Sequence, residues 1–510
     1  MATRHHDGPA CDTCRRRRLH KSALIRLVVA GQRFCRLDPR SGLLVRREWH
    51  EQTIPITHEG FVWGTDRFEE LVPVGNYDTN GIRNLYRRGG LGIPLVVASR
   101  APLGEPFLVD QAVFPATLQM HVGPEAEDDD CISHPLEREI RLELYDPLRK
   151  DCTIATEKPE KISKDLSAAL AYRLRNDSQN IFEDFVRSGS TRGEGRLRTL
   201  EPYQPGKVPV VLIHGLLSNP FTWVEMVNEL QNHPGFLDDF QIWAFEYPTG
   251  QPFLDSAAGL RRQLRASRRL FDPDGKDPIL AETVLIGHSM GGLLAKLQVT
   301  KSGDDLWRSV ARIPIEQVVV SEEIRQRAIE SFYFEPSPSV SRVIFMATPH
   351  RGSAFARSCI GRLGSSLVSE SGTRKREHAQ LIRDNPGVFR PELEERIPTS
   401  IDLLEPNSLL LKAISRVPAS SRVRMHSVIG SRCCTLLEGR SDGVVPVSSA
   451  KESRAITERI VKATHTQVNK HPDAIREVIA ILNLHLQESC QACAESSNET
   501  DALLNESLSL

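Results

Sequence analysis

The sequence lacks the features that mark several large classes of protein. It contains no run of about 18 apolar residues, the length that a membrane-spanning helix requires, so no such helix is predicted. The 65 Lys and Arg residues are balanced by 66 Asp and Glu residues, and this balance gives no reason to expect binding to nucleic acid. Ten cysteines in 510 residues are too few for a disulfide-rich scaffold.

Two pairs of cysteines nevertheless have the spacing of metal ligands. Cys11 and Cys14 lie near one end of the sequence, and Cys490 and Cys493 lie near the other. The four thiolates would make a zinc site if the two ends met. Both pairs lie in segments predicted to be poorly ordered, so free thiols are the favoured interpretation and no metal is expected.

The first 45 residues are basic and irregular, and we expect them to be poorly ordered. Four arginines, Arg15–Arg18, precede a short apolar run over 24–30. This order is similar to the start of a signal peptide, but Arg26 interrupts the apolar run and no small-residue cleavage site follows. We therefore expect no signal peptide and, by default, a cytoplasmic protein.

Residues 46–200 are predicted to form an accessory region, α+β or rich in β-structure, of unknown role. Strands are predicted where apolar residues alternate with polar ones or run together, over 91–98, 115–122 and 139–145. Helices are predicted over 165–174 and 180–186. No catalytic constellation is found here, and a glycine- and serine-rich break over 188–195 marks the domain boundary.

After this break, strands and helices alternate along the chain. Buried strands are predicted over 208–213, 241–245, 283–286, 340–347 and 424–429, and helices after Asn219, over 256–271 and over 473–486. This alternation predicts an α/β fold with a mostly parallel sheet and helices on both faces. The domain is expected to span 205–487, with a disordered polar tail over 488–510.

The hexapeptide Gly287–Gly292 (GHSMGG) lies between the predicted strand 283–286 and a predicted helix. Gly-x-Ser-x-Gly in a strand–turn–helix is typical of a nucleophile elbow, in which flanking glycines let the strand and helix approach while Ser289 stands clear of the sheet. The alternative is an ordinary glycine-rich turn.

A serine hydroxyl needs a base to remove its proton, usually a histidine oriented by a carboxylate. When the serine lies in a nucleophile elbow, the acid follows it in the sequence and the histidine follows the acid. Asp442 fits the acid, because it lies at a turn in the segment Gly439–Pro446 (GRSDGVVP) after a predicted strand. The alternative is an ordinary Asp-Gly turn, which is common.

Two histidines compete for the role of the base. His465 lies in a loop after a short apolar run, whereas His471 precedes a proline where the last helix begins. A structural role at the helix start explains His471, so His465 is the preferred base.

The developing oxyanion needs two preorganised donors. The backbone N–H of Met290, the residue after the nucleophile, is one candidate. Leu216 is the other, because Gly215 lets the backbone after the first strand turn inward. His214 is predicted to be a structural hydrogen-bonding residue of that loop.

Taken in order, these segments resemble the lipase and esterase branch of the α/β-hydrolase superfamily. The segments that carry the likeness are Val210–Leu216, Gly287–Gly292, Ala347–Ser353, Ser441–Pro446 and Thr464–His465. The Thr-Pro-His-x-Gly-Ser element within Ala347–Ser353 is similar to one in membrane-associated lipase-like hydrolases, including relatives of the glycosylphosphatidylinositol deacylases. The resemblance covers roughly residues 205–487. It implies a Ser289 nucleophile, an acyl-enzyme and hydrolysis by water, with His465 as shared acid and base and no metal or organic cofactor.

Residues 351–405 lie between two predicted strands and could form a lid or acyl-binding wall over the site. Its lining would include Phe355, Ile360, Leu363 and Leu367. An ordinary helical excursion that packs on the core is an equal alternative.

The sequence therefore predicts a serine hydrolase that cleaves carboxylic esters with an apolar acyl group and takes part in lipid metabolism. An acyltransferase or thioesterase would use the same triad, and a non-catalytic binding protein would keep only the fold. The expected partner is a small-molecule ester or a lipid, with peripheral membrane contact for a lipid substrate and no nucleic acid. Oligomeric state stays open.

Overall fold

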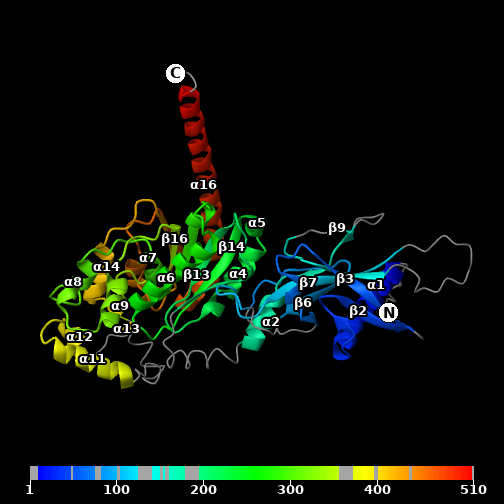
Figure 1. Cartoon of the computed structure of the whole chain (residues 1–510), viewed down its shortest axis with the longest axis horizontal. Coiled ribbons are helices and arrows are strands. Elements are labelled where there is room, and N and C mark those ends of the chain that lie inside the picture. Colours follow the sequence, from blue (N-terminus) through cyan, green and yellow to red (C-terminus); the bar gives the residue numbers. More distant parts are fainter. Residues whose placement is uncertain are drawn as a thin grey trace, which may run out of the picture. The chain divides into compact units, whose positions relative to one another are not determined.

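The computed structural model describes residues 10–47, 50–74, 82–99, 104–123, 140–149, 153–154, 160–177, 195–354, 372–395, 400–435 and 439–507. The chain forms two compact units (Figure 1). The first comprises Met1–Asn180, Thr199–Pro202 and Gln231–Asp238, and the second comprises Ile181–Arg198, Tyr203–Leu230 and Asp239–Leu510. None of the helices in the described ranges combines the length and apolar character needed to cross a membrane.

The first unit is built on a seven-stranded sheet in the order β1-β2-β3-β8-β7-β6-β4. Its pairings are antiparallel except for β3 with β8, which is parallel. Along the chain the elements are α1 (Ala10–Arg33), β1 (Leu37–Asp38), β2 (Gly42–Arg47), β3 (His50–Glu59), η1 (Thr65–Arg67), β4 (Glu70–Pro73), β5 (Arg87–Arg88), β6 (Ile93–Ala98), β7 (Val113–Val122), β8 (Ile140–Tyr145), β9 (Thr153–Ile154), β10 (Glu160–Lys161), β11 (Lys164–Asp165) and α2 (Ala168–Asp177). The three strands predicted in this region are present as β6, β7 and β8.

The N-terminal segment differs from the prediction of poor order, because residues from Ala10 onward form α1. Leu24 and Val28 are four residues apart and therefore share one face of the helix. Both side chains are buried against Leu37, Leu43 and other core residues of the sheet. Part of the short apolar run after the arginines thus packs on this core, whereas Ile25 and Val29 of the same run are exposed.

The second unit is built on a seven-stranded sheet in the order β12-β14-β13-β15-β16-β17-β20. The pairings from β14 to β20 are all parallel. All six residues of β13 (Val208–Ile213) and of β15 (Thr283–His288) are buried. Because successive side chains point to opposite faces of a strand, both faces of the sheet are covered, as the continuous apolar runs predict.

From β12 onward the remaining elements are β12 (Arg196–Thr199), η2 (Pro220–Trp223), α4 (Val224–Gln231), α5 (Phe236–Asp239), β14 (Phe240–Glu246), α6 (Phe253–Phe271), η3 (Ile279–Glu282), α7 (Met290–Lys296), α8 (Asp305–Arg308), η4 (Ile315–Gln317), α9 (Glu322–Phe332), β16 (Val340–Met346), α11 (Gly372–Asp384), α12 (Pro391–Glu395), α13 (Ser400–Leu403), α14 (Leu409–Arg416), β17 (Arg424–Gly430), β18 (Cys433–Thr435), β19 (Gly439–Ser441), α15 (Val447–Ala450), β20 (Thr457–Val461), η6 (His465–Lys470) and α16 (Pro472–Ser507). Helices α6, α7 and α9 pack together, with α7 against β13, β15 and β16.

The order of the central strands creates a switch point in the sheet. The chain leaves β13 toward β14 on one side, whereas β15 pairs with β13 on the other side. Ligands of open parallel sheets bind outside the carboxyl ends of the strands at such a point. The loops after β13 and β15 are therefore the expected place for a site.

The segment predicted as a lid or helical excursion is described only in part. Phe355, Ile360, Leu363 and Leu367 lie outside the described residues. Phe389, farther along the same segment, is buried in a small apolar cluster with residues of α8 and η4. This part packs on neighbouring helices, and the lid stays a prediction.

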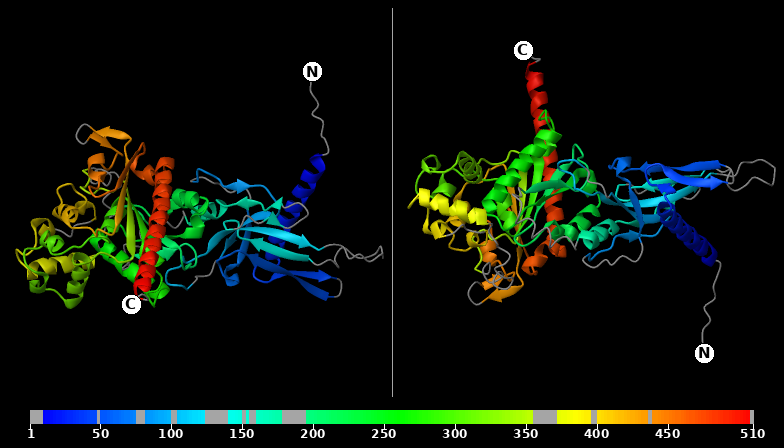
Figure 2. Two further views of the ribbon diagram at one scale, coloured as in Figure 1. Left: turned by 90° about the horizontal axis from the view of Figure 1, so that it is seen from above. Right: turned by 60° about the horizontal axis from the view of Figure 1, so that its bottom comes forward.

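The C-terminal segment also differs from the prediction, because α16 continues to Ser507 across most of the expected disordered tail. Residues 473–507 contain neither glycine nor proline and are rich in Ala, Leu and Glu, which favour helix. The helix starts against β20 and continues past the sheet of this unit (Figure 2). Arg342 of β16 anchors its middle by an ion pair of 2.5 Å to Glu488.

Candidate active site

The predicted nucleophile lies at a sharp turn between β15 and α7. Ser289 has φ of +55° and ψ of −126°, a backbone conformation that a residue with a side chain seldom adopts. Its backbone N–H donates to the carbonyl of Met346 on the neighbouring strand over 2.8 Å. Its own carbonyl accepts a hydrogen bond of 3.0 Å from the N–H of Gly292. These two hydrogen bonds hold the strained turn by the backbone N–H and the carbonyl of Ser289.

The glycines around this turn are required by space. A Cβ atom at Gly287 would lie 2.5 Å from the backbone nitrogen of Gly292. At Gly291 it would overlap the carbonyl oxygens of Ile213 and His214 at the end of β13. These two positions therefore cannot carry a side chain without moving the strand and helix apart, which is the reason inferred from the motif.

The predicted base and acid converge on Ser289 from the carboxyl ends of two other strands. His465 Nε2 lies 2.9 Å from Ser289 Oγ, and His465 Nδ1 lies 2.8 Å from Asp442 Oδ2. Asp442 is reached after β17 and His465 after β20. An Nδ1–H that donates to the carboxylate leaves Nε2 free to accept the serine proton, which is the tautomer that general-base chemistry needs.

The carboxylate of Asp442 is itself fixed by the backbone that follows it. Its Oδ1 accepts hydrogen bonds from the N–H groups of Val444 and Val445, over 2.9 and 2.7 Å. Its carbonyl accepts the backbone N–H of His465 over 2.9 Å. Asp442 and His465 are therefore joined through both side chain and backbone, and the carboxylate keeps one oxygen for the imidazole.

His471, the competing candidate, lies away from this hydrogen-bonded set. Its Nδ1 accepts a hydrogen bond of 3.2 Å from the backbone N–H of Asp473, at the first turn of α16. This contact satisfies one of the unpaired donors at a helix start. His471 has the capping role that the sequence indicated.

Two residues near the site were not singled out in the sequence. His288 occupies the position between Gly287 and Ser289 in the Gly-x-Ser-x-Gly motif. Its Nε2 donates to the backbone carbonyl of His465 over 2.9 Å, and burial lowers its pKa to about 3. Gly430 ends β17, and a Cβ there would lie 2.7 Å from the Cβ of Asp442. A histidine next to the nucleophile and a glycine that ends the strand before the acid are the signals that could have identified them.

The loop after β13 runs beside the nucleophile. A Cβ at Gly215 would lie 2.9 Å from the Cβ of Ser289, so the backbone passes this side chain closely. Leu217 has a positive φ of +53°, and its N–H donates to Thr249 Oγ1 over 3.3 Å. Met290 is the first residue of α7, where backbone N–H groups have no acceptor within the helix. Leu216 and Met290 therefore remain the proposed oxyanion donors.

His214 holds this loop, as predicted. Its Nδ1 donates to the carbonyl of Gly215 over 3.0 Å, and its Nε2 accepts the backbone N–H of Tyr247 over 3.4 Å. The Tyr247 ring stacks on the imidazole, with centroids 4.4 Å apart. Burial lowers the pKa of His214 to about 4, so the ring stays neutral and structural.

Within the described part of the chain, no group of three or more His, Cys, Asp or Glu residues is arranged to hold a metal ion. The side chains of Cys11, Cys14, Cys490 and Cys493 lie outside the described residues. The zinc site that they would form is therefore not tested by the structure.

Comparison with solved structures finds hydrolases at low sequence identity. The mature lipase of Bacillus licheniformis is 16% identical, with 57% of this chain and 97% of that chain covered and a TM-score of 0.34. A carboxylesterase of the thaumarchaeon Nitrososphaera gargenis is 13% identical, with 59% and 98% covered and a TM-score of 0.32. A putative epoxide hydrolase of Pseudomonas aeruginosa is 12% identical, with 58% and 95% covered and a TM-score of 0.30.

The family can be assigned from the sequence match. No curated protein matches the chain. The model of the alpha/beta hydrolase family matches residues 210–478, which is more than half of the chain and includes Ser289, Asp442 and His465. The chain therefore belongs to the α/β-hydrolase family.

Proposed function

We propose that this protein is a serine hydrolase that cleaves carboxylic esters with an apolar acyl group through an acyl-enzyme. The observation that carries the proposal is the pair of contacts made by His465, 2.9 Å to Ser289 Oγ and 2.8 Å to Asp442 Oδ2. These distances are within the hydrogen-bond range that proton transfer requires. The two hydrogen bonds connect the proposed nucleophile, base and orienting carboxylate without a gap.

In the first half of the reaction, Ser289 Oγ attacks the ester carbonyl while His465 Nε2 takes the hydroxyl proton. The carbonyl oxygen becomes an oxyanion, which the backbone N–H groups of Leu216 and Met290 would stabilise. Removal of one such donor typically costs about 2.7–4 kcal/mol of transition-state stabilisation. Collapse of the tetrahedral intermediate breaks the ester C–O bond, and His465 returns the proton to the departing alcohol.

In the second half, a water molecule attacks the acyl carbon and His465 accepts its proton. The carbon–oxygen bond to Ser289 then breaks, the proton returns to Oγ, and the carboxylic acid leaves. Asp442 keeps the imidazole in one tautomer throughout and stabilises its protonated form. The net reaction consumes one water molecule and restores the enzyme.

The proposal is tested with a fluorophosphonate probe and a series of p-nitrophenyl esters of increasing acyl length. We expect the probe to label Ser289 and turnover to be faster for longer apolar acyl groups than for acetate. Ser289→Ala is expected to abolish labelling and turnover while its unfolding midpoint stays close to that of the natural protein. Turnover that survives in Ser289→Ala would refute the assignment of the nucleophile.

An acyltransferase or thioesterase is the second candidate, because each forms the same acyl-enzyme from the same three residues. Turnover of acyl thioesters, and the yield of acyl transfer to added alcohols and amines relative to hydrolysis, would distinguish them. A non-catalytic protein that keeps the fold is disfavoured by the continuous hydrogen bonds from Asp442 to Ser289. Failure of the probe to label Ser289 would favour it.

A further inference from the structure

The Thr348–Ser353 segment (TPHRGS) follows β16 and has no part in the chemistry above. It lies against the loop that carries the acid, residues 442–452, which we call the acid loop. Ala347, just before the segment, has a positive φ of +51°, and Gly352 has one of +82°. A side chain at Gly352 would approach the carbonyl of Leu404 to 2.7 Å. The backbone of this segment is therefore tightly constrained.

Two serine hydroxyls join the segment to the acid loop. Ser353 belongs to the segment and Ser449 belongs to the loop. Ser353 Oγ donates to the carbonyl of Val444, whose N–H is held by Asp442 Oδ1. Ser449 Oγ donates to the carbonyl of Gly352 over 2.6 Å and accepts the N–H of Arg351 over 3.2 Å. Both serine side chains are buried. Val444 is thus held on one side by the catalytic carboxylate and on the other by Ser353.

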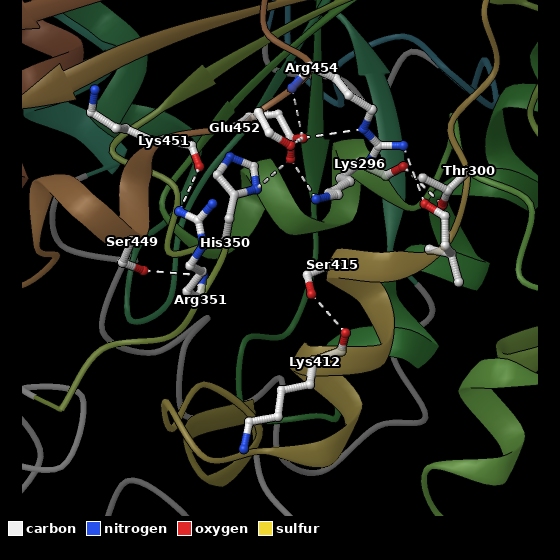
Figure 3. Close-up of polar contacts among 12 residues, drawn as sticks. Lys296, Thr300, His350, Arg351, Lys412, Ser415, Ser449, Lys451, Glu452 and Arg454 are labelled. Carbon is white, nitrogen blue, oxygen red and sulfur yellow. Dashed lines mark hydrogen bonds and ion pairs between the residues drawn. The ribbon is translucent and has the colours of Figure 1, made fainter.

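The Arg351 guanidinium extends this connection along the acid loop. Its Nη1 donates to the carbonyls of Ser448 and Lys451, over 2.5 and 3.2 Å. Figure 3 shows Arg351 between Ser449 and Lys451, with its side chain directed at the loop backbone. The backbone N–H and guanidinium of Arg351 and the hydroxyl of Ser353 therefore donate to the acid loop. The hydroxyl of Ser449 donates from the loop back to the segment.

The far end of the acid loop is fastened to the nucleophile helix by a buried ion pair. Lys296 Nζ lies 2.6 Å from Glu452 Oε2, and the two side chains are 2% and 4% exposed. Lys296 is the last residue of α7, the helix that begins directly after Ser289. Figure 3 shows Glu452 between Lys296, His350 and Arg454. Arg454 Nε lies 3.3 Å from Oε1 and His350 Nδ1 lies 3.5 Å from Oε2.

The two members of this pair respond differently to burial, because burial lowers the pKa of the Lys296 ammonium whereas the carboxyl group of Glu452 keeps its charge. Burial opposes ionisation of Glu452, but the charge of Lys296 outweighs it and lowers the pKa of Glu452 to about 2. Burial also lowers the pKa of His350 to about 3, so its ring is neutral. A buried carboxylate with a cationic partner of fixed position ties two elements at a defined distance.

From this geometry we propose that the Thr348–Ser353 segment and Lys296 form a brace that sets the position of Asp442 relative to Ser289 and His465. Ser353 and Ser449 act as positioning residues, since they touch neither the substrate nor the reacting atoms. The inference rests on the proposed function, because it assigns Asp442 as the carboxylate that orients His465. It gives the Thr-Pro-His-x-Gly-Ser element a physical role in this chain.

The consequence for the reaction follows from the contacts. Without the hydroxyls of Ser353 and Ser449, the acid loop loses its hydrogen bonds at the carbonyl of Val444 and to the carbonyl of Gly352. The carboxylate of Asp442 can then change its distance to His465. A misplacement of 1 Å in a catalytic constellation can lower the rate about 100-fold.

The test uses Ser353→Ala, Ser449→Ala and the double variant in the full chain. The matched control is Ser415→Ala, because Ser415 Oγ also donates to a backbone carbonyl, that of Lys412 over 2.7 Å, on the exposed face of α14 (Figure 3). Pre-steady-state acylation with a p-nitrophenyl ester is followed by stopped flow at pH 7.5. Unfolding midpoints and KM are measured for every variant.

We expect acylation by the double variant to be about 10- to 100-fold slower, with KM unchanged. The control is expected to match the natural protein. Natural acylation rates in the double variant, whatever its unfolding midpoint, would overturn the brace. A natural protein that is not labelled by the fluorophosphonate probe would instead overturn the proposed function, so the two failures are distinct.

Discussion

Acidification is expected to unfold the second unit at a pH where most proteins are stable. Five of its histidines are buried, and burial is the largest cause of the low pKa of each. The pKa is about 4 for His214 and His485 and about 3 for His288, His350 and His426. The positive charge of Arg342 adds to the effect at His426 and His485. An unfolded histidine has a pKa of about 6.5.

The sign of the effect follows from proton binding. Between the folded and unfolded pKa values, the unfolded chain binds protons that the folded chain does not, so stability falls as pH falls below about 6.5. Each group contributes a loss of about 1.4 kcal/mol per pH unit, and five groups together approach about 7 kcal/mol per unit. Total stability of a domain is about 5–15 kcal/mol. We therefore expect the second unit to unfold by about pH 5.

The measurement is proton uptake during urea unfolding at pH 5.5, together with urea midpoints at pH 7.5, 6.5 and 5.5. Unfolding should take up about four to five protons through these histidines. Glu452, with a pKa of about 2, adds its own loss of stability below its unfolded value of about 4.5, outside this interval. His350→Leu should lower the uptake by about one proton. A free energy of unfolding that is constant from pH 7.5 to 5.5 would refute the reasoning.

Three further outcomes are expected. His288→Phe removes the donor to the carbonyl of His465 and should slow acylation about 10- to 100-fold, whereas His288→Gln keeps a nitrogen near the position of Nε2 and should retain most of the rate in the same stopped-flow assay. Gly430→Ala places a methyl group 2.7 Å from the Cβ of Asp442 and should cost about 1–3 kcal/mol of stability in urea unfolding. Lys296→Met removes the nearer cation from buried Glu452, which keeps Arg454, and should cost up to about 3–5 kcal/mol, most of which the double variant Lys296→Met with Glu452→Leu should recover.

The sequence predicted those parts of the fold in which local structure dictates the residue types, such as buried strands and tight turns. A strand buried on both faces must be apolar throughout, so β13 and β15 were visible as apolar runs. The turn at Ser289 requires glycines at fixed offsets, so it was visible as a motif. The order of Asp442 and His465 after Ser289 then limited the candidates for acid and base to a few residues.

The parts that were not predicted depend on contacts between distant segments. The basic N-terminal run looked irregular because the burial of Leu24 and Val28 depends on a sheet that follows in the chain. The role of His288 could not be predicted, because its partner, the carbonyl of His465, lies 177 positions away.

The parallel sheet and the loops constrain the proposed site to different degrees. Ser289 and Gly215 follow two neighbouring strands, so register within the sheet sets their separation directly. Asp442 lies 12 residues beyond the end of β17, after the hairpin of β18 and β19, and the sheet alone cannot fix its position. Such a loop needs its own connections, and the hydrogen bonds of Ser353, Ser449 and Arg351 supply them. Substitutions at Gly287 and Gly291 should therefore affect mainly stability, whereas loss of the Ser353 and Ser449 hydroxyls should affect mainly the rate.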